Sequence, residues 1–350
     1  MYRDGGIKVA IYGAGAMGTV LGAFLTEGGV KADLISRNKE HIAALKERGA
    51  HIVCSQNGVE KRIEVNALLP EEMTEKYDVI FLMTKQKDNA SIASFLTEYL
   101  QEDGVICTTQ NGLPEEGISK IIGREKTYGA AVSFGATFIG KGSVELTSAL
   151  SAMSMEVGGY LNDGKKTGLL TEILSVVGSV CGNPNFVKGT ENLAGARWSK
   201  LAINSAFSGL SVVTGLTFGE IAKRKKSKKL AIAVIRECLS VAKAAGVTPA
   251  KMSGHDMEKL LCGKGFIASK KAELVLPIAM KKHARLLSGM LKDVQNGRKC
   301  EIDLVNGAVV KAGATLNVET PYCRQIVELV HGIENGLYEI SYENLDFFNL

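Results

Sequence analysis

The chain has 350 residues, of which 45% are apolar and 23% are charged. This composition excludes an intrinsically disordered chain, and the length favours two domains. No apolar segment approaches the roughly 20 residues that a membrane-spanning helix requires, and no signal peptide precedes the first predicted strand. The seven cysteines have no CxxC spacing, which argues against a zinc site and a disulfide framework. We therefore expect a cytoplasmic protein without a metal or a membrane partner.

The net charge of +5 has a local origin. The run KRKKSKK at Lys223–Lys229 carries six positive charges, so the rest of the chain has a net charge of −1. A nucleic-acid patch is one interpretation of such a run. Because it contains no aromatic residue and lies between two helical patterns, we expect a solvated connection between helices and no nucleic-acid partner.

The first predicted element is a strand, a glycine-rich turn and a helix over residues 7–25. The turn reads GAGAMG, and its residues are Gly13, Ala14, Gly15, Ala16, Met17 and Gly18. In such a turn the first glycine permits the bend, the second lets the backbone approach a pyrophosphate, and the third lets helix and strand pack closely. The pyrophosphate would bind the unpaired N–H groups at the helix N-terminus. This context predicts a dinucleotide site, with a ligand-free glycine turn as the alternative.

Strand and helix patterns then alternate to about residue 187, as a parallel sheet requires. Buried strands are predicted at residues 31–36, 77–84 and 104–109, a hairpin at 52–69, and further antiparallel strands at 128–137 and 142–158. Helical spacing of apolar residues follows at 193–213, 230–245, 278–291, 301–312 and 322–339. We expect a Rossmann-type dinucleotide-binding domain over residues 1–188 and an all-helical substrate domain over residues 189–350, with the site in a cleft between them.

The end of the second strand indicates which nicotinamide cofactor binds. In NAD-binding folds this strand usually ends in an acidic residue that holds the ribose 2′-hydroxyl. Here it ends in Ser36-Arg37-Asn38-Lys39, and Asp33 lies too early in the strand to take that place. Because the guanidinium of Arg37 suits a 2′-phosphate, we expect NADP rather than NAD. A solvated loop arginine is the alternative.

Reduction of a carbonyl would also require a proton donor. None of the five histidines adjoins a carboxylate pattern typical of an acid–base pair. Lys200 and Asn204 are four residues apart and share one face of a predicted helix that is otherwise apolar. Desolvation lowers the pKa of a lysine towards the range useful for acid catalysis. From this pattern alone, Lys200 is either a proton donor or an exposed surface lysine.

The chain resembles the ketopantoate reductase (2-dehydropantoate 2-reductase) family almost from end to end. The motifs that carry the resemblance follow in the family's order and spacing: GAGAMG at 13–18, Thr84-Lys85, Gln110-Asn111-Gly112, KLAIN at 200–204, GMLKD at 289–293, EID at 301–303, Asn306-Gly307 and Thr320-Pro321. The resemblance implies NADPH-dependent reduction of 2-dehydropantoate to (R)-pantoate, on the way to pantothenate and coenzyme A. It also implies hinge closure between the domains, which would exclude water.

The resemblance further implies roles for individual residues. Lys200 would be the general acid that protonates the keto oxygen, and Asn204 would position the substrate. Glu301 would bind the substrate hydroxyl and support the lysine, and Asn111 would lie near the nicotinamide and the substrate carbonyl. Asn111 and Glu301 are therefore expected to contact the cofactor as well. Arg37 and Lys85 would hold the adenosine end of NADPH.

Two positions depart from the family pattern. The family's NPLT run is replaced by SAFSGL at residues 205–210, where Ser208 could still offer a hydroxyl to the substrate. Gly289 replaces a serine that contacts the substrate carboxylate in the family, and Ser288 or Lys292 could compensate.

These departures leave three hypotheses. The first is reduction of 2-dehydropantoate, and the second is reduction of another branched or aromatic 2-oxoacid with NADP(H). The third is a non-catalytic NADP-binding redox sensor, which would not need the proton donor Lys200. The expected partners are a small-molecule 2-oxoacid and, from the resemblance, a second copy of the chain in a homodimer.

Overall fold

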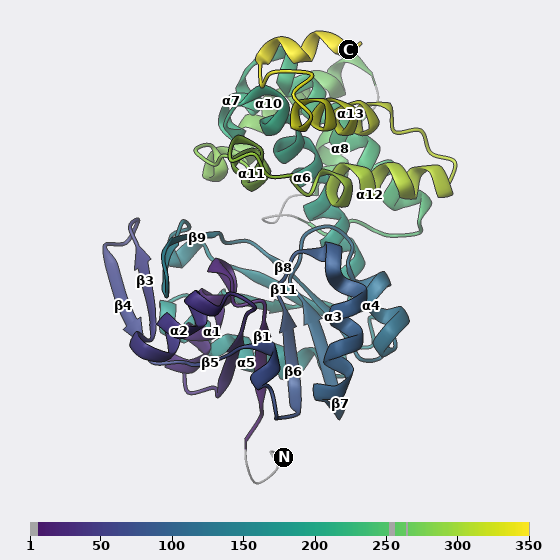
Figure 1. Ribbon diagram of the computed structural model, residues 1–350. Helices are drawn as coiled ribbons and strands as arrows, with labels where there is room; N and C mark the ends of the chain where they lie inside the picture. The colour runs from purple at the N-terminus through teal and green to yellow at the C-terminus, as the bar shows by residue number, and fades with distance from the viewer. Residues whose placement is uncertain (1–5, 252–255, 264, 350) are drawn as a thin grey trace. The chain divides into compact units, whose positions relative to one another are not determined.

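The computed structural model describes residues 6–251, 256–263 and 265–349. The chain divides into two compact units (Figure 1). Unit 1 comprises the described residues up to Gln110 together with Pro114–Leu193, and unit 2 comprises Asn111–Leu113 and the described residues from Ala194 onwards. The division predicted at residues 188/189 falls inside a strand at Val187–Gly189, which pairs within unit 1.

An eight-stranded sheet forms the centre of unit 1. In chain order its strands are β1 (Val9–Tyr12), β2 (Ala32–Ile35), β5 (Asn66–Leu68), β6 (Tyr77–Leu82), β7 (Leu100–Thr108), β8 (Thr127–Val132), β11 (Met155–Gly159) and β12 (Val187–Gly189). Their order in the sheet is β12-β11-β8-β7-β6-β1-β2-β5. Neighbouring strands are parallel except for the antiparallel pair β8 and β11. The predicted parallel α/β architecture is thereby confirmed.

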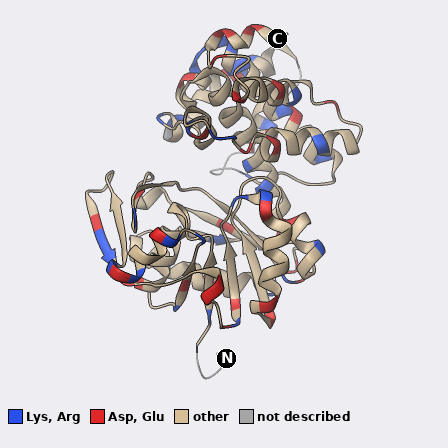
Figure 2. Cartoon of the chain, viewed as in Figure 1, with Lys and Arg blue, Asp and Glu red and all other residues tan. Residues whose placement is uncertain are grey.

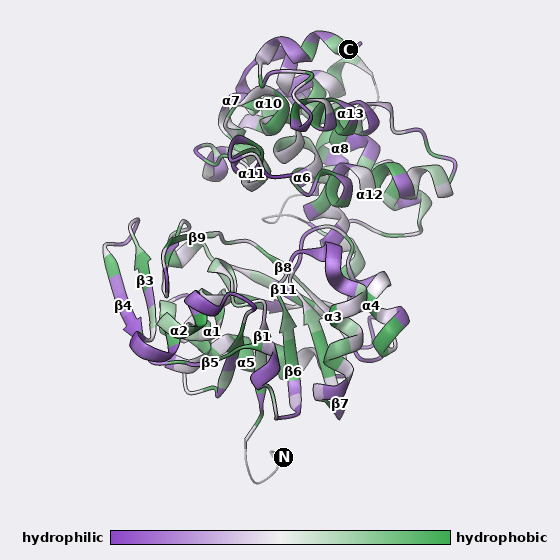
Figure 3. Ribbon diagram, viewed as in Figure 1, coloured by the Kyte–Doolittle hydropathy of each residue, from purple (hydrophilic) through white to green (hydrophobic). Residues whose placement is uncertain are grey.

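Helices cover both faces of this sheet. They are α1 (Ala16–Glu27), α2 (Lys39–Arg48), α3 (Asn89–Leu96), α4 (Glu115–Ile122) and α5 (Thr167–Cys181). Alternate residues of β1 face opposite sides: Val9 and Ile11 belong to the core that α1 and α5 cover, and Ala10 and Tyr12 to the core that α3 and α4 cover. A strand buried on both faces is expected to be mainly apolar, and the sequence VAIY of the fully buried β1 agrees with this. Figure 3 shows green, hydrophobic strands in the middle of this sheet.

A second, four-stranded sheet accompanies the first, in the order β4-β3-β10-β9. It contains β3 (Ala50–Cys54), β4 (Val59–Ile63), β9 (Ala136–Gly140) and β10 (Ser143–Leu146). The predicted hairpin is β3 and β4, which pair antiparallel around a turn where Gly58 has φ +62°. The prediction extended the hairpin too far, because Asn66–Leu68 instead pairs with β2 in the main sheet.

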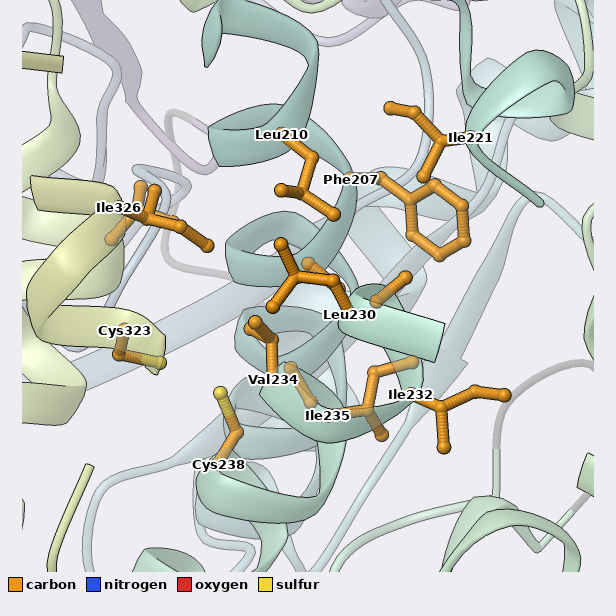
Figure 4. Close-up of a cluster of buried hydrophobic side chains, with 14 of the residues drawn as sticks. Phe207, Leu210, Ile221, Leu230, Ile232, Val234, Ile235, Cys238, Cys323 and Ile326 are labelled. Atoms are coloured by element: carbon orange, nitrogen blue, oxygen red, sulfur yellow. The ribbon is translucent and has the colours of Figure 1, made fainter. Parts of the chain in front are cut away.

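Unit 2 is helical, as predicted. Its helices are α6 (Leu193–Thr214), α7 (Phe218–Lys223), α8 (Lys225–Ala244), α9 (Met257–Leu261), α10 (Phe266–Ala279), α11 (Gly289–Gln295), α12 (Ile302–Thr315) and α13 (Pro321–Glu334), followed by a short 3-10 helix at Tyr342–Phe347. Figure 4 shows how the core forms: Phe207 and Leu210 of α6 lie near Leu230 of α8 and Ile326 of α13. Burial of this apolar surface is the main force that holds these helices together.

The basic run lies where α7 meets α8. Lys223 ends α7, Arg224 separates the helices, and α8 already begins at Lys225, five residues before the predicted start. The guanidinium of Arg224 lies 5.2 Å from the centre of the Tyr342 ring. The run is thus a helix–helix junction whose lysines mostly belong to α8, and it includes ion pairs of Arg224 with Glu220 and of Lys226 with Asp346. Figure 2 shows that residues of both charge signs are distributed along the chain. Among the described residues, none of the helices combines the length and apolar character needed to cross a bilayer.

Candidate active site

The glycine-rich turn follows β1 directly. Gly13 has φ +109°, a left-handed conformation that favours glycine. The N–H groups of Gly13 and Ala14 both donate to the carbonyl oxygen of Ile35, at 2.9 and 2.8 Å. The N–H of Gly15 donates to the carbonyl oxygen of Gly13 at 2.7 Å. These bonds tie the turn to the end of β2 and start α1 at Ala16.

Gly13 and Gly18 lie where a larger residue would clash with the backbone, whereas Gly15 faces open space. A Cβ on Gly13 would lie 2.6 Å from backbone atoms of Met83 and Thr84, and a Cβ on Gly18 would lie 2.4 Å from the carbonyl oxygen of Gly13. A Cβ on Gly15 would have no neighbour nearer than 3.9 Å. No side chain caps α1, and its first turn has no acidic residue. Its N-terminal N–H groups therefore suit an anion, so the turn fits a dinucleotide pyrophosphate.

Three neighbouring parallel strands end beside this turn. Tyr12, the last residue of β1, is in register with Ile35 of β2 and Leu82 of β6. Arg37 follows β2 by two residues, and Lys85 follows β6 by three. Both cations thus come directly after the carboxyl ends of the strands that flank the glycine turn, which is where open parallel sheets bind ligands.

Arg37 is well exposed. Its guanidinium is 69% exposed and contacts the carboxylate of Asp88 at 3.3 Å. An exposed ion pair contributes little free energy, so a phosphate could replace the carboxylate at modest cost. Asp33, by contrast, accepts hydrogen bonds from the Tyr77 hydroxyl and the Asn66 amide, each at 2.7 Å. This engagement agrees with the interpretation that Asp33 does not hold a ribose.

Gln110, to which the sequence assigned no role, organises the end of β6. Its Nε2 donates to the carbonyl oxygen of Thr84 (2.8 Å) and to Oδ1 of Asn89 (2.7 Å). Its Oε1 accepts from Nδ2 of Asn89 (2.9 Å) and from the hydroxyl of Thr108 (3.0 Å). Because Gln110 is only 7% exposed, this network holds firmly the segment that precedes Lys85. The only feature of the sequence that could have indicated this role of Gln110 is its place in the Gln110-Asn111-Gly112 motif.

Helix α6 carries a polar stripe. From Gly195 to Thr214, all of which the structure describes, every residue is buried except Lys200, Ile203, Asn204 and Ser208. Lys200, Asn204 and Ser208 follow one another at intervals of four residues and therefore share one helix face, and Ile203, three residues after Lys200, lies at the edge of that face. The predicted Lys200–Asn204 pair thus occupies the partly exposed face of a helix that is otherwise core, and Ser208 extends that face by one turn.

Two further predicted residues lie at helix starts. Glu301 is the N-cap residue of α12 and is partly buried. Ser288 caps α11: it is 2% exposed, and its hydroxyl accepts the N–H of Met290 at 3.1 Å. Because this hydroxyl is engaged in the cap, a substrate contact of Ser288 stays a prediction. At Gly289 a Cβ would meet nothing within 4 Å, and Lys292 is exposed.

Asn111 belongs to the helical unit. The chain leaves unit 1 after Gln110, contributes Asn111–Leu113 to unit 2, where Leu113 packs against the core, and returns to unit 1 at Pro114. Unit 1 holds the predicted turn, Arg37 and Lys85. Unit 2 holds the remaining predicted site residues: Asn111, Lys200, Asn204, Ser208, Ser288 and Glu301. The predicted site residues are thus divided between the two units, and Asn111 and Glu301, for which a cofactor contact was predicted as well, belong to unit 2.

Comparison with known proteins places the chain in a family. The model described as "Ketopantoate reductase PanE/ApbA" matches residues 9–158, and the model of the C-terminal domain of that family matches residues 192–334. The chain is 28% identical over 344 residues to the 2-dehydropantoate 2-reductase of Lactococcus lactis, covering 95% of this chain and 99% of that protein. The corresponding enzyme of Archaeoglobus fulgidus is 25% identical, with 94% and 99% covered.

Solved structures share the fold at lower identity. D-mandelate dehydrogenase in complex with NADH and anilino(oxo)acetate gives a TM-score of 0.79 at 24% identity, covering 95% of this chain and 99% of that chain. A ketopantoate reductase from Ralstonia eutropha gives 0.76 at 24%, covering 94% and 99%. A dimeric ketopantoate reductase from Staphylococcus aureus gives 0.70 at 18%, also covering 94% and 99%. Because the two family models together span most of both units, the chain belongs to the ketopantoate reductase family.

Proposed function

We propose that this protein catalyses the NADPH-dependent reduction of 2-dehydropantoate to (R)-pantoate. Family membership supports the reaction, and curated relatives that match over nearly their whole length carry out this activity by name. The observation that carries the proposal is the stripe on α6, where Lys200 and Asn204 occupy the partly exposed face of a buried helix. A lysine and an amide placed in this way suit proton donation to a carbonyl and orientation of a polar substrate.

Unit 1 would hold the cofactor. The N–H groups of Ala16 and Met17, at the start of α1, would bind the pyrophosphate. Arg37 would bind the 2′-phosphate, and Lys85 would add a second cation at the same sheet edge. When bound, NADPH supplies the hydride for the reduction. The open space above Gly15 and the exposed guanidinium of Arg37 support this assignment.

Unit 2 would supply the remaining chemistry. The Nζ of Lys200 would donate a proton to the keto oxygen as negative charge develops there. Asn204 and Ser208, one and two turns further along α6, would hydrogen-bond the substrate and orient it. Glu301 would accept a hydrogen bond from the substrate hydroxyl and favour the charged form of Lys200. Asn111 would contact both the substrate carbonyl and the cofactor.

Substitution of Lys200 tests the proposal. Lys200→Ala should lower kcat for ketopantoate by about 100-fold or more, the usual contribution of a general acid, while the NADPH Kd changes little. Lys229→Ala, which removes an exposed lysine of α8, is the matched control and should leave kcat unchanged. A Lys200→Ala protein with the wild-type kcat would remove Lys200 from the mechanism.

A second candidate is the reduction of a bulkier or aromatic 2-oxoacid. It is motivated by Gly289, which leaves open space where the family carries a serine, and by the fold likeness to D-mandelate dehydrogenase. Ketopantoate, 2-oxoisovalerate and phenylglyoxylate, each assayed with NADPH and with NADH, separate the candidates. A higher kcat/KM for phenylglyoxylate would favour the second one. If ketopantoate is the substrate, Gly289→Ser should lower its KM, because the space can accept the added hydroxyl.

We also propose that the protein forms a homodimer through unit 2. Helix α10 exposes large apolar side chains, among them Ile267 (84% exposed), Leu274 (72%) and Ile278 (73%), whose spacing of seven and four residues puts them on one face. A similar protein, the Staphylococcus aureus ketopantoate reductase, is described as dimeric. Sedimentation should show a dimer that Leu274→Glu dissociates and that Leu337→Glu, at an exposed leucine outside α10, leaves intact. A monomeric wild type would refute this.

A cytoplasmic location is the final part of the proposal. No disulfide joins any of the seven cysteines, all of which lie in the described part of the chain, and this is typical of a reducing compartment. Cell fractionation with an immunoblot tests it, and recovery of the protein in an extracytoplasmic fraction would refute it.

A further inference from the structure

One asparagine links the two helices that carry the predicted substrate residues. Asn306 of α12 is completely buried, and its Nδ2 donates to the carbonyl oxygen of Ser205 in α6 at 3.1 Å. The two residues are 101 positions apart in the sequence. Oδ1 of Asn306 and the hydroxyl of Ser205 are also buried, and the described residues offer neither atom a hydrogen-bond partner. The contact is therefore one directional bond beside two buried polar atoms that have no partner among the described residues.

The position of this bond relates it to the predicted chemistry. Ser205 directly follows Asn204 and lies five residues after Lys200, while Asn306 lies five residues after Glu301. The bond thus joins α6, which carries the proposed proton donor, to α12, whose N-cap position Glu301 occupies. Gly209 allows this approach, because a Cβ there would lie 2.8 Å from Oδ1 of Asn306.

Stability does not account for a buried asparagine here. A buried carbonyl oxygen without a hydrogen-bond partner costs free energy, and an apolar side chain of similar shape would avoid that cost. A single buried amide in an apolar interface instead selects one relative position of two helices, as it does in coiled coils. What Asn306 provides is therefore a fixed register of α12 against α6.

We propose that Asn306 is a positioning residue for the reduction. Its bond to Ser205 sets the register of α6 against α12 and thereby holds Lys200 and Asn204 in a fixed relation to Glu301. The inference rests on the proposed function and adds to it a residue that touches neither substrate nor cofactor.

Asn306→Leu, which has nearly the same shape, tests this inference. Because a small misplacement of reacting groups slows the chemical step, kcat for ketopantoate should fall by about 10- to 100-fold. The deuterium isotope effect on kcat, measured with NADPH deuterated at the transferred position, should rise because hydride transfer becomes more rate-limiting. The melting temperature should not fall, and the NADPH Kd should stay within a factor of two. A loss of folded protein would instead lower the apparent kcat and leave the isotope effect unchanged.

Asn344 provides the matched control. It is buried as well, and its Nδ2 donates to the carbonyl oxygen of Val213, at the other end of α6, at 3.0 Å. Asn344→Leu should change the melting temperature and leave kcat and the isotope effect unchanged. If Asn306→Leu does not fold, Asn306→Ala takes its place with the same expectations for kcat and the isotope effect.

The outcomes separate this inference from the proposed function. Wild-type kcat and isotope effect in both Asn306 variants would overturn the inference, and so would an equal rise of the isotope effect in Asn344→Leu. If the wild-type protein reduces no 2-oxoacid, the proposed function fails, and amide hydrogen exchange then tests the register directly. Exchange over residues 200–208 should be faster in Asn306→Leu than in Asn344→Leu, and equal exchange would overturn the inference.

Discussion

Replacing Gly15 by alanine should separate cofactor binding from stability. The added Cβ would have no neighbour nearer than 3.9 Å, so the folded protein can accept it without moving. Gly15 has φ −79° and ψ −160°, a conformation that alanine also adopts. Alanine is a poorer N-cap than glycine, but it reduces the entropy of the unfolded chain, and these effects are each about 1 kcal/mol or less and of opposite sign. The free energy of unfolding should therefore change by less than about 1 kcal/mol.

The effect on NADPH should be much larger. In the proposed cofactor site, the methyl group would fill the open space beside Gly15 through which a pyrophosphate would reach the N–H groups at the start of α1. Loss of one hydrogen bond to a charged group costs about 1.5–3 kcal/mol. Since each 1.4 kcal/mol corresponds to a factor of ten, the NADPH Kd should rise by about 10- to 100-fold.

Fluorescence titration with NADPH and thermal unfolding of the apoprotein measure the two effects. Gly168→Ala is the matched control, because a Cβ on Gly168, near the N-terminus of α5, also meets no atom within 4 Å. It should leave both the NADPH Kd and the melting temperature nearly unchanged. A Gly15→Ala protein that binds NADPH as tightly as the wild type would refute the assignment of the turn to the pyrophosphate.

Three further predictions follow from unit 1. Gly18→Ala should weaken NADPH binding and also destabilise the protein by about 1–3 kcal/mol, because its Cβ would lie 2.4 Å from a backbone oxygen; an unchanged denaturant midpoint would contradict this. Arg37→Ser should raise the NADPH Kd about 10-fold and leave that of NADH unchanged, and an equal effect on both cofactors would argue against a 2′-phosphate contact. Burial lowers the pKa of His41 below its ordinary value of 6.5, so the unfolded chain binds the proton first as the pH falls. The free energy of unfolding should therefore decrease as the pH drops below about 6.5, by at most about 1.4 kcal/mol per pH unit. Denaturant unfolding at a series of pH values should show a smaller slope for His41→Gln, and an equal slope in the variant would refute the role of His41.

Local sequence patterns predicted those parts of the site that consecutive residues build. The turn at residues 13–18 is one, since φ at Gly13 and the packing of Gly18 depend on a short strand-turn-helix segment. The stripe on α6 is another, because polar residues four apart in an apolar helix must share a face. Contacts distant in sequence were not predictable in this way. The bonds from Gln110 to Thr84 and from Asn306 to Ser205 leave no local pattern, although both residues lie in motifs that the sequence analysis had identified.

The prediction of one helix over residues 278–291 was wrong for a similar reason. α10 ends at Ala279 and α11 begins at Gly289, although apolar residues continue at helical spacing between them. In this interval the carbonyl oxygens of Ala284 and Leu286 accept the N–H groups of Gly219 and Phe218, each at 3.0 Å. Backbone bonds to a segment more than 60 residues earlier thus replace the bonds of a continuous helix, and apolar spacing alone cannot detect them.

The grouping of the site into two sets of residues leads to a last prediction. Gly15→Ala should act on NADPH affinity alone and Asn306→Leu on the chemical step alone, because Gly15 belongs to unit 1 and Asn306 to the core of unit 2. Independent substitutions change free energies additively, within about 0.5 kcal/mol. The double variant should therefore show the NADPH Kd of Gly15→Ala together with the kcat of Asn306→Leu at saturating NADPH. A larger loss of NADPH affinity in the double variant would mean that the register of α6 also affects cofactor binding, and Asn306 would then contribute to both functions of the site.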